Sequence, residues 1–275
     1  MADSDMAWAK VDPTYVPPEI DTTKPSVARV YDAILGGKDN FAVDRAVAEQ
    51  AVRAMGDGGS GARLNRAALG RAVRFMSGLG IAQFLDLGSG LPTAQNTHQI
   101  AQAVNPAARV VYVDNDYSAY IHGLALLVDN ASTTVVLGDV RDPDKLLATP
   151  GVADFLDFAQ PVGLILNAVI HHVLDEEDPY GIVSRYKEAL VPGSYMQLTH
   201  FCDASAEARA NEQVLRQSLG RGQTRSREQI VRFFDGLDLV EPGVVFLPLW
   251  RPEEPVPLPL DTGSTLMLGG VGRKP

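Results

Sequence analysis

Short apolar runs recur along the middle of the chain, separated by longer segments with the composition of helices. The runs are rich in aliphatic and β-branched residues and span Ile81–Leu87, Arg109–Val113, Thr133–Leu137 and Val162–Leu166. Runs of this length and composition are typical of strands that are buried on both faces. Their alternation with helical segments predicts a parallel sheet whose strands are joined by crossover helices.

Polar side chains follow these runs at nearly constant intervals. Asp86, Asp114, Asp139 and Asn167 are separated by 28, 25 and 28 residues. Each interval suits one strand–helix–strand unit. Because the carboxyl ends of neighbouring parallel strands line one crevice, we expect these four side chains to face a shared ligand. Any one of them alone is equally compatible with a solvated strand end.

A glycine turn ends the first run, in the sequence Phe84-Leu85-Asp86-Leu87-Gly88-Ser89-Gly90. Glycine permits positive φ angles and lets a ligand approach the backbone closely. The following segment, Ala94–Val104, is predicted to be a helix that starts near Pro92 and Thr93 and points its N-terminus at the same crevice. Thr93 stands where the dinucleotide fingerprint has its third glycine, which weakens an NAD-binding interpretation.

Composition narrows the class of protein. The chain has 275 residues, 45% of them apolar, which is enough for one large α/β domain. Its net charge of -10 disfavours an extended contact with nucleic acid. Cys202 has no partner for an intrachain disulfide, Met1–Lys10 lacks the pattern of a signal peptide, and the apolar segment Val162–Ile170 is too short to span a membrane. We expect a soluble cytoplasmic protein with neither a nucleic-acid nor a membrane partner.

The strand ends also carry a family resemblance. The glycine turn, the acidic Asp114, Gly138-Asp139-Val140 and Asn167 resemble the successive motifs of class I S-adenosylmethionine-dependent methyltransferases, over Ile81–His200. Leu190–Ser194 is similar to the turn before that family's fifth strand. Leu239–Gly243 is similar to its sixth-strand region.

The two ends of the chain resemble a narrower group. Ala28–Phe41 and Gly269–Pro275 are similar to actinobacterial S-adenosyl methyltransferases once catalogued as a domain of unknown function. The resemblance implies a Rossmann-like α/β fold, with a seven-stranded, mostly parallel sheet and an antiparallel edge hairpin. It also implies an N-terminal helical lid, residues 1–62, and a methyltransferase domain, residues 63–275, within one globular unit. The proline-rich Trp250–Leu260 is expected to be the loop of the hairpin.

The resemblance implies that the strand ends bind S-adenosylmethionine as the cofactor. Asp86 would orient its ammonium group, and Asp114 would accept both ribose hydroxyls. Asp139 and the Val140 N–H would recognise the adenine edge, since a carboxylate accepts from an amine while an N–H donates to a ring nitrogen. Asn167 would close the pocket beside the sulfonium. The full expected set is Asp86, Gly88, Ser89, Gly90, Asp114, Asn115, Asp139, Val140, Asn167 and Ala168.

The N-terminal segment Ser26–Gln50 predicts two helices separated by Gly36-Gly37. Class I methyltransferases commonly cover the cofactor with residues that precede the first strand, so the resemblance implies a lid here. The residues expected to contact cofactor or acceptor are Tyr31, Lys38, Asn40 and Phe41. The alternative is an ordinary helix pair packed on the sheet edge, with Gly37 as a C-cap.

Two histidines, His171 and His172, follow Asn167 at a place expected to overlook the methyl group. A neutral imidazole there would accept a proton from the acceptor, and the alternative is a structural role. The acidic run Asp175–Asp178 before Pro179 is interpreted as a solvated helix start, and no metal is predicted.

Arginines gather in the last third of the chain, around a predicted helix Asp203–Leu219 and a second helix that Ser226 and Gln229 begin as a capping box. They form either a solvated helix face or a site for an anionic acceptor. The arginines are Arg216, Arg221, Arg225, Arg227 and Arg232. Arg63 and Arg66 on an earlier helix are likewise either solvated or available to a carboxylate.

Together these features predict transfer of a methyl group from S-adenosyl-L-methionine to an unidentified small-molecule acceptor. The protein would mainly align the acceptor with the electrophilic methyl group and exclude water. Two alternatives are compatible with the same residues: a non-catalytic module that binds this cofactor, and an NAD-dependent oxidoreductase.

Overall fold

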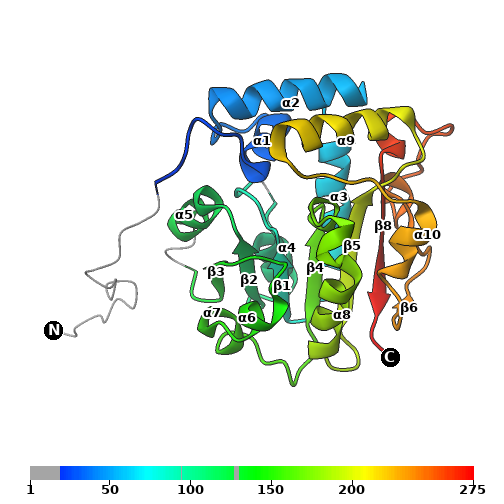
Figure 1. The fold of residues 1–275 in the computed structure, drawn as a ribbon. Helices are drawn as coiled ribbons and strands as arrows, with labels where there is room; N and C mark the ends of the chain where they lie inside the picture. The colour runs from blue at the N-terminus through cyan, green and yellow to red at the C-terminus, as the bar shows by residue number, and fades with distance from the viewer. Residues whose placement is uncertain (1–18, 94, 127–129) are drawn as a thin grey trace.

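Eight strands form one sheet through the middle of the molecule (Figure 1). The structure is a computed structural model that describes residues 19–93, 95–126 and 130–275. The strands are β1 (Gln83–Leu87), β2 (Arg109–Asp114), β3 (Thr133–Leu137), β4 (Gly163–Asn167), β5 (Tyr195–Phe201), β6 (Asp238–Leu239), β7 (Val245–Phe246) and β8 (Met267–Arg273). Their order is β3-β2-β1-β4-β5-β8-β6, and β7 also pairs with β8.

The five strands β1 to β5 pair in parallel, which confirms the predicted crossover sheet. β8 is antiparallel to β5, and the short strands β6 and β7 are antiparallel to β8. All residues of β1 are buried, because apolar side chains cover both faces of the sheet.

The predicted count of seven strands is wrong by one. The chain turns after Leu239, so the expected sixth-strand region yields two separate strands of two residues each, β6 and β7. Pro242 has no N–H to donate to a ladder, and Gly243 takes a φ of +83° and donates its N–H to the Val240 carbonyl. The Trp250–Leu260 segment lies between β7 and β8, as predicted for the hairpin loop.

Helices pack on both faces of the sheet. On one face, α3 (Ser60–Gly78) and α4 (Thr97–Val104) cover Phe84, Val110 and Ile165. On the other, α6 (Pro143–Leu147), α7 (Pro150–Ala153), α8 (Pro179–Ala189) and α10 (Arg227–Arg232) cover the alternate strand positions. The other elements are α1 (Val27–Leu35), α2 (Ala42–Met55), α5 (Tyr117–Leu126), α9 (Ala206–Leu219), and the 3-10 helices η2 (Ile170–His172), η3 (Asp175–Glu177), η4 (Leu247–Leu249) and η5 (Gly263–Thr265). None of the described helices is long and apolar enough to cross a membrane.

The helix after the glycine turn is shorter than predicted. α4 begins at Thr97 rather than at Ala94, which itself lies outside the described residues. Asn96 caps this helix, and its N–H donates to Gln99 Oε1 at 2.8 Å. An Asn with a Gln three residues later is a stronger start signal than Pro92 and Thr93, so the chain stays in a loop until Asn96.

The N-terminal helices α1 and α2 lie across one end of the sheet, and α9 runs beside α2 (Figure 1). The predicted helix pair is confirmed, although Gly36 rather than Gly37 is the C-cap, with a φ of +81°. The division between residues 62 and 63 falls inside α3 and stays a prediction. Residues 1–18 of the expected lid segment lie outside the described residues.

A buried ion pair joins α1 to α2. Arg29 Nε donates to Asp44 Oδ2 at 2.9 Å, and the two side chains are 6% and 0% exposed. Asp44 also accepts the backbone N–H groups of Ser26 at 3.0 Å and Phe41 at 2.8 Å. This carboxylate therefore holds the start of α1 and the start of α2 at the same point.

We expect Asp44→Ala to lower the free energy of unfolding by about 3–5 kcal/mol, because it leaves the Arg29 charge buried and unpaired. The matched control is Glu49→Ala, also on α2, whose pair with Arg53 is 3.5 Å long and mostly exposed. The control should change stability by less than about 0.5 kcal/mol. Chemical denaturation of both variants provides the measurement, and equal effects would contradict the role given to Asp44.

Candidate functional site

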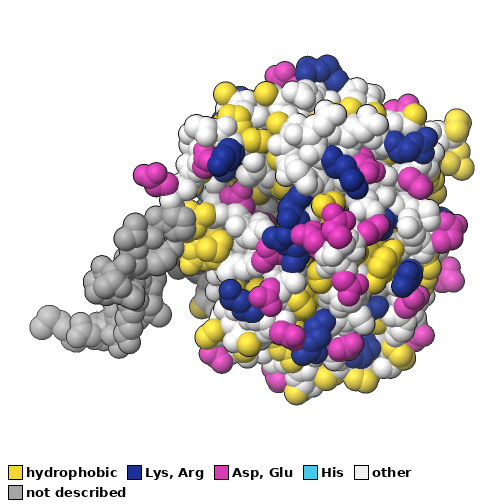
Figure 2. Space-filling model, in the orientation of Figure 1, with side chains coloured by type: hydrophobic (Ala, Val, Ile, Leu, Met, Phe, Trp, Pro, Cys, Tyr) yellow, Lys and Arg dark blue, Asp and Glu magenta, His cyan; other side chains and the backbone are white. Residues whose placement is uncertain are grey.

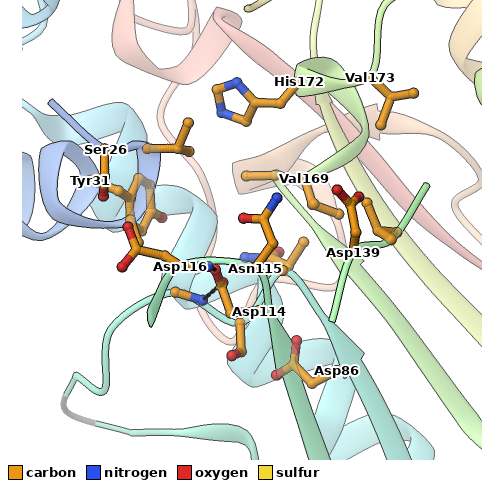
Figure 3. A pocket seen from close by; sticks show the side chains of 18 of the residues that line it. Ser26, Tyr31, Asp86, Asp114, Asn115, Asp116, Asp139, Val169, His172 and Val173 are labelled. Carbon is orange, nitrogen blue, oxygen red and sulfur yellow. Dashed lines mark hydrogen bonds between the residues drawn. The ribbon is translucent and has the colours of Figure 1, made fainter. Parts of the chain in front are cut away.

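One cavity opens at the carboxyl ends of β1 to β4, under the first turn of α1. Its volume is about 370 Å³, within the ~300–1,000 Å³ typical of small-molecule sites. In Figure 3, side chains from the strand ends, from α1 and from η2 surround it. All residues of the set predicted from the strand ends and the glycine turn line this cavity. The structure therefore brings together what the spacing of the motifs predicted.

The glycine turn has the close backbone approach expected of it. Gly88 has a φ of +68°, and a Cβ added there would collide with the side chain of Val169 on the loop after β4. Gly90 also has a φ of +68° and donates its N–H to Asp114 Oδ2 at 2.8 Å. A side chain at either position would strain the turn, and at Gly88 it would also push against the loop after β4.

Asp86 is buried at the end of β1 and meets the first residue of α4. Thr97 Oγ1 donates to Asp86 Oδ2 at 2.6 Å. Burial raises the pKa of Asp86 to about 6, while the Thr97 hydrogen bond and the charge of Arg66 act in the opposite direction. The α4 N-terminus thus contacts this carboxylate.

Asp114 is buried at the end of β2 and is held by backbone donors. Its two oxygens accept from the N–H groups of Gly90 at 2.8 Å and Asp116 at 2.9 Å. Burial raises the pKa of Asp114 to about 6, against the effect of these two donors. Two acidic groups with raised pKa values therefore lie side by side in one cavity wall (Figure 3).

Asp139 follows β3 and is oriented by a neighbouring guanidinium. Arg141 donates from Nε to Asp139 Oδ1 at 2.9 Å and from Nη2 to Oδ2, which holds the pKa of Asp139 below its usual value. The backbone N–H of Val140 has no hydrogen-bond partner among the described residues, and Val140 also lines the cavity. An acceptor and a free donor thus lie next to each other at this strand end.

Asn167 at the end of β4 is linked to α1 through buried polar groups. Its Oδ1 accepts from Gln197 Nε2 at 3.0 Å. Thr199 Oγ1 accepts the Ala168 N–H at 2.9 Å and donates to Asn65 Oδ1 at 2.8 Å. Asn65 Nδ2 in turn donates to the Tyr31 hydroxyl, and Tyr31 lines the cavity.

The two histidines of η2 differ in position. His172 lines the cavity, whereas His171 packs away from it against Phe201 and His200, with ring centroids 4.7 and 5.7 Å apart. Burial, followed by the charge of Arg221, lowers the pKa of His172 to about 4. Burial also lowers the pKa of His171. Both rings are neutral at pH 7, and of the pair only His172 lines the cavity.

Only one of the four predicted lid residues lines the cavity. Tyr31 lines the cavity, but Lys38, Asn40 and Phe41 do not. Asn40 Nδ2 donates to Asp32 Oδ2 at 2.8 Å, the Phe41 ring lies against the Arg29 guanidinium, and Lys38 is exposed. The first turn of α1 faces the cavity instead, through Ser26, Val27 and Ala28. Ser26 is an N-cap signal in the sequence, so the helix start could have been found but not its direction.

The arginines have separate roles. Arg66 and Arg221 line the cavity, and Arg66 forms no ion pair with a described residue. Arg225 is fully buried, which contradicts both a solvated face and an acceptor site for that residue. Arg141, Val169, Val173 and Leu69 line the cavity and were not predicted.

The acidic residues after η2 cap a helix and form ion pairs. Asp178 is the N-cap of α8, accepting from the Gly181 N–H, which confirms the predicted helix start. Asp175 pairs with Arg225 at 2.7 Å, and Glu177 pairs with Arg141 and Arg221 at 2.6 and 3.0 Å.

The strand order, the glycine turn and the polar strand ends agree with one family. A family model described as S-adenosyl methyltransferase matches residues 13–275. The chain belongs to this family. No curated protein matches the chain. The chain is accordingly an S-adenosylmethionine-dependent methyltransferase with a class I, Rossmann-like fold, as predicted.

Two crystal structures of similar proteins agree with this assignment. A protein from Thermobifida fusca, provisionally called a methyltransferase, is 46% identical with a TM-score of 0.90, covering 95% of this chain and 99% of that chain. A DUF574 family protein from Streptomyces avermitilis is 37% identical with a TM-score of 0.89, covering 94% and 100%. Nothing in these comparisons favours an NAD-dependent oxidoreductase or a non-catalytic module.

The raised pKa values of Asp86 and Asp114 have a consequence for the methyltransferase's stability. Both values, about 6, lie above the ordinary 3.8, so the native state binds these protons more tightly than the unfolded chain. Stability from these groups is therefore absent above the native pKa, grows as pH falls through 6, and is complete below 3.8.

We expect the wild type to gain about 1 kcal/mol per group between pH 7.5 and 5, relative to an Asp86→Asn/Asp114→Asn variant. Urea unfolding of both proteins at the two pH values measures this difference. The buried histidines titrate in both proteins, so their contribution cancels. A difference that does not change with pH would contradict the raised pKa values.

Proposed function

We propose that the cavity holds S-adenosylmethionine along the ends of β1 to β4 and exposes its methyl group to a small-molecule acceptor under α1. One observation carries this proposal: four neighbouring strands each end in a polar side chain that lines the same cavity, next to a glycine turn. This arrangement is the usual ligand position of open parallel sheets.

The residues at β1 fit the amino-acid part of the cofactor. Asp86 accepts a hydrogen bond from Thr97 at Oδ2, and its Oδ1 stays available as an acceptor for an ammonium group. Arg66 on α3 lines the same part of the cavity, and its charge acts on Asp86. A guanidinium without an ion-pair partner suits the carboxylate of the same amino acid.

The next two strands fit the nucleoside. Asp114 is held rigidly by two backbone N–H groups, which leaves acceptor positions for ribose hydroxyls. Asp139 supplies an acceptor and the Val140 N–H a donor, the pair that an adenine edge requires. Arg141 fixes the orientation of Asp139 without removing its charge.

The fourth strand and α1 enclose the reacting part. Bound S-adenosylmethionine supplies an electrophilic methyl group on a sulfonium. Asn167, Tyr31 and His172 surround the space beside it, and their positions are fixed by the hydrogen bonds through Thr199 and by η2. The neutral His172 ring is able to accept a proton from an acceptor hydroxyl or amine.

A small acceptor suits the size and surroundings of the cavity. The first turn of α1 lines one side of it, and the volume of about 370 Å³ is that of a small-molecule site. On the face drawn in Figure 2, basic and acidic side chains are intermingled rather than gathered into a basic groove. The absence of a nucleic-acid partner and the cytoplasmic location stay predictions.

We expect Asp114→Asn to weaken binding of S-adenosylhomocysteine by about 10-fold or more, because it removes a charged acceptor worth ~1.5–3 kcal/mol. Titration calorimetry measures the affinity, and Asp235→Asn, an exposed carboxylate after α10, is the control. Binding of NAD but not of S-adenosylhomocysteine by the wild type would overturn the proposed site.

A further inference from the structure

The segment between α9 and α10 forms hydrogen bonds with the backbone that carries His172. Its residues 221–225 donate hydrogen bonds to four successive backbone carbonyls, those of residues 170–173. Arg225 reaches the first and last carbonyls at 3.4 and 3.0 Å, the Gln223 N–H reaches the second at 2.8 Å, and Arg221 Nη1 reaches the third at 3.2 Å. Every carbonyl of this stretch is therefore bound by the 221–225 segment.

Arg225 anchors this segment from below. It has no exposed surface and pairs with Asp175 at 2.7 Å. Its Nη1 also donates to His200 Nε2 at 2.6 Å, while His200 Nδ1 donates to the Phe201 carbonyl. These contacts fix Arg225, and thereby the 221–225 segment that places Arg221 at the cavity wall.

Arg221, which lines the cavity, has hydrogen-bond donors that are not used within the described part of the protein. Its three hydrogen bonds all come from Nη1, to the His172 carbonyl and to the two oxygens of Glu177. The Nε and Nη2 groups have no partner among the described residues, and the side chain is 34% exposed where it lines the cavity. An Nε/Nη2 edge is the fork that binds a carboxylate in two parallel hydrogen bonds.

Arg221 belongs to a group of two guanidiniums and two carboxylates whose charges balance. Glu177 is shared between Arg221 and Arg141, and Asp139 is paired with Arg141. The neighbouring His172 is neutral at pH 7. An anionic group on a ligand would thus meet the unbonded N–H groups of Arg221, and both nearby carboxylates are already paired.

Apolar side chains also line the cavity. Val27 and Ala28 of α1 and Val169 and Val173 on either side of η2 line it together with Arg221. Such a wall excludes water and strengthens a charge-assisted hydrogen bond at its edge. The combination suits a hydrophobic molecule that carries one acidic group.

We propose that the methyl acceptor is an apolar small molecule with a carboxylate, and that Arg221 binds this carboxylate through its Nε/Nη2 edge. The inference rests on the proposed function, because it takes the strand-end part of the cavity to be filled by the cofactor. Arg221 is then a specificity-determining residue, and the 221–225 segment places it beside His172.

Titration calorimetry with benzoate and benzamide on protein loaded with S-adenosylhomocysteine tests this. The two probes share shape and differ in charge, so benzoate should bind saturably and at least about 10-fold tighter than benzamide. Arg221→Met should remove this preference, and Arg221→Lys, which keeps the charge but not the fork, should keep part of it. Arg227→Met, an exposed arginine on α10, should bind both probes like the wild type.

Several results would overturn the proposal: no saturable benzoate binding, equal affinities for the two probes, or a full preference in Arg221→Met. The wild-type comparison decides the matter even where Arg221→Met does not fold. Affinity for S-adenosylhomocysteine is measured first on the same samples. Its absence counts against the proposed cofactor site, whereas intact cofactor binding without a benzoate preference counts against the Arg221 inference alone.

Discussion

The structure depends on one constraint: strands that pair in parallel end at the same edge of a sheet. β1 pairs with β2 and β4, and β2 pairs with β3, so four strand ends meet in one place. A polar residue at each end is then partly removed from water. This burial raises the pKa values of Asp86 and Asp114 to about 6. Hydrogen bonds from Thr97, Gly90 and Asp116 partly offset the loss of hydration.

This constraint explains why half of the site was predictable. Strand ends are visible in a sequence because apolar runs stop there, and a constant spacing shows that they belong to one sheet. The predicted strand-end and turn residues, of which Asp86 is the first and Ala168 the last, therefore line the cavity as expected. The turn at Gly88 was also predictable, because a glycine directly after an apolar run indicates a tight turn. The structure adds the reason that only glycine fits there: a Cβ would collide with the Val169 side chain.

The other half depends on contacts between distant segments, which spacing does not reveal. Helix α1 was predicted correctly, but its contacts with the cavity and with α2, such as the Arg29–Asp44 pair, depend on tertiary packing that no local pattern indicates. Lys38, Asn40 and Phe41 come after the end of α1 and do not line the cavity. Arg225 is a similar case, because it precedes α10 and its burial follows from its hydrogen bonds to η2 and His200. Composition alone assigns an arginine to solvent, and here tertiary hydrogen bonds override it.

The two halves of the cavity thus differ in how they are built. The strand ends, where we propose that the cofactor binds, are held by turns and by backbone donors such as the Gly90 and Asp116 N–H groups. The acceptor side joins α1, η2 and the 221–225 segment, and α9 packs on α2, so these parts form one connected layer over the sheet. We therefore expect substitutions in that layer to change acceptor binding without disturbing Asp86 or Asp114. The acceptor must therefore be identified from the chemistry of this layer, where Arg221 and the neutral His172 lie side by side.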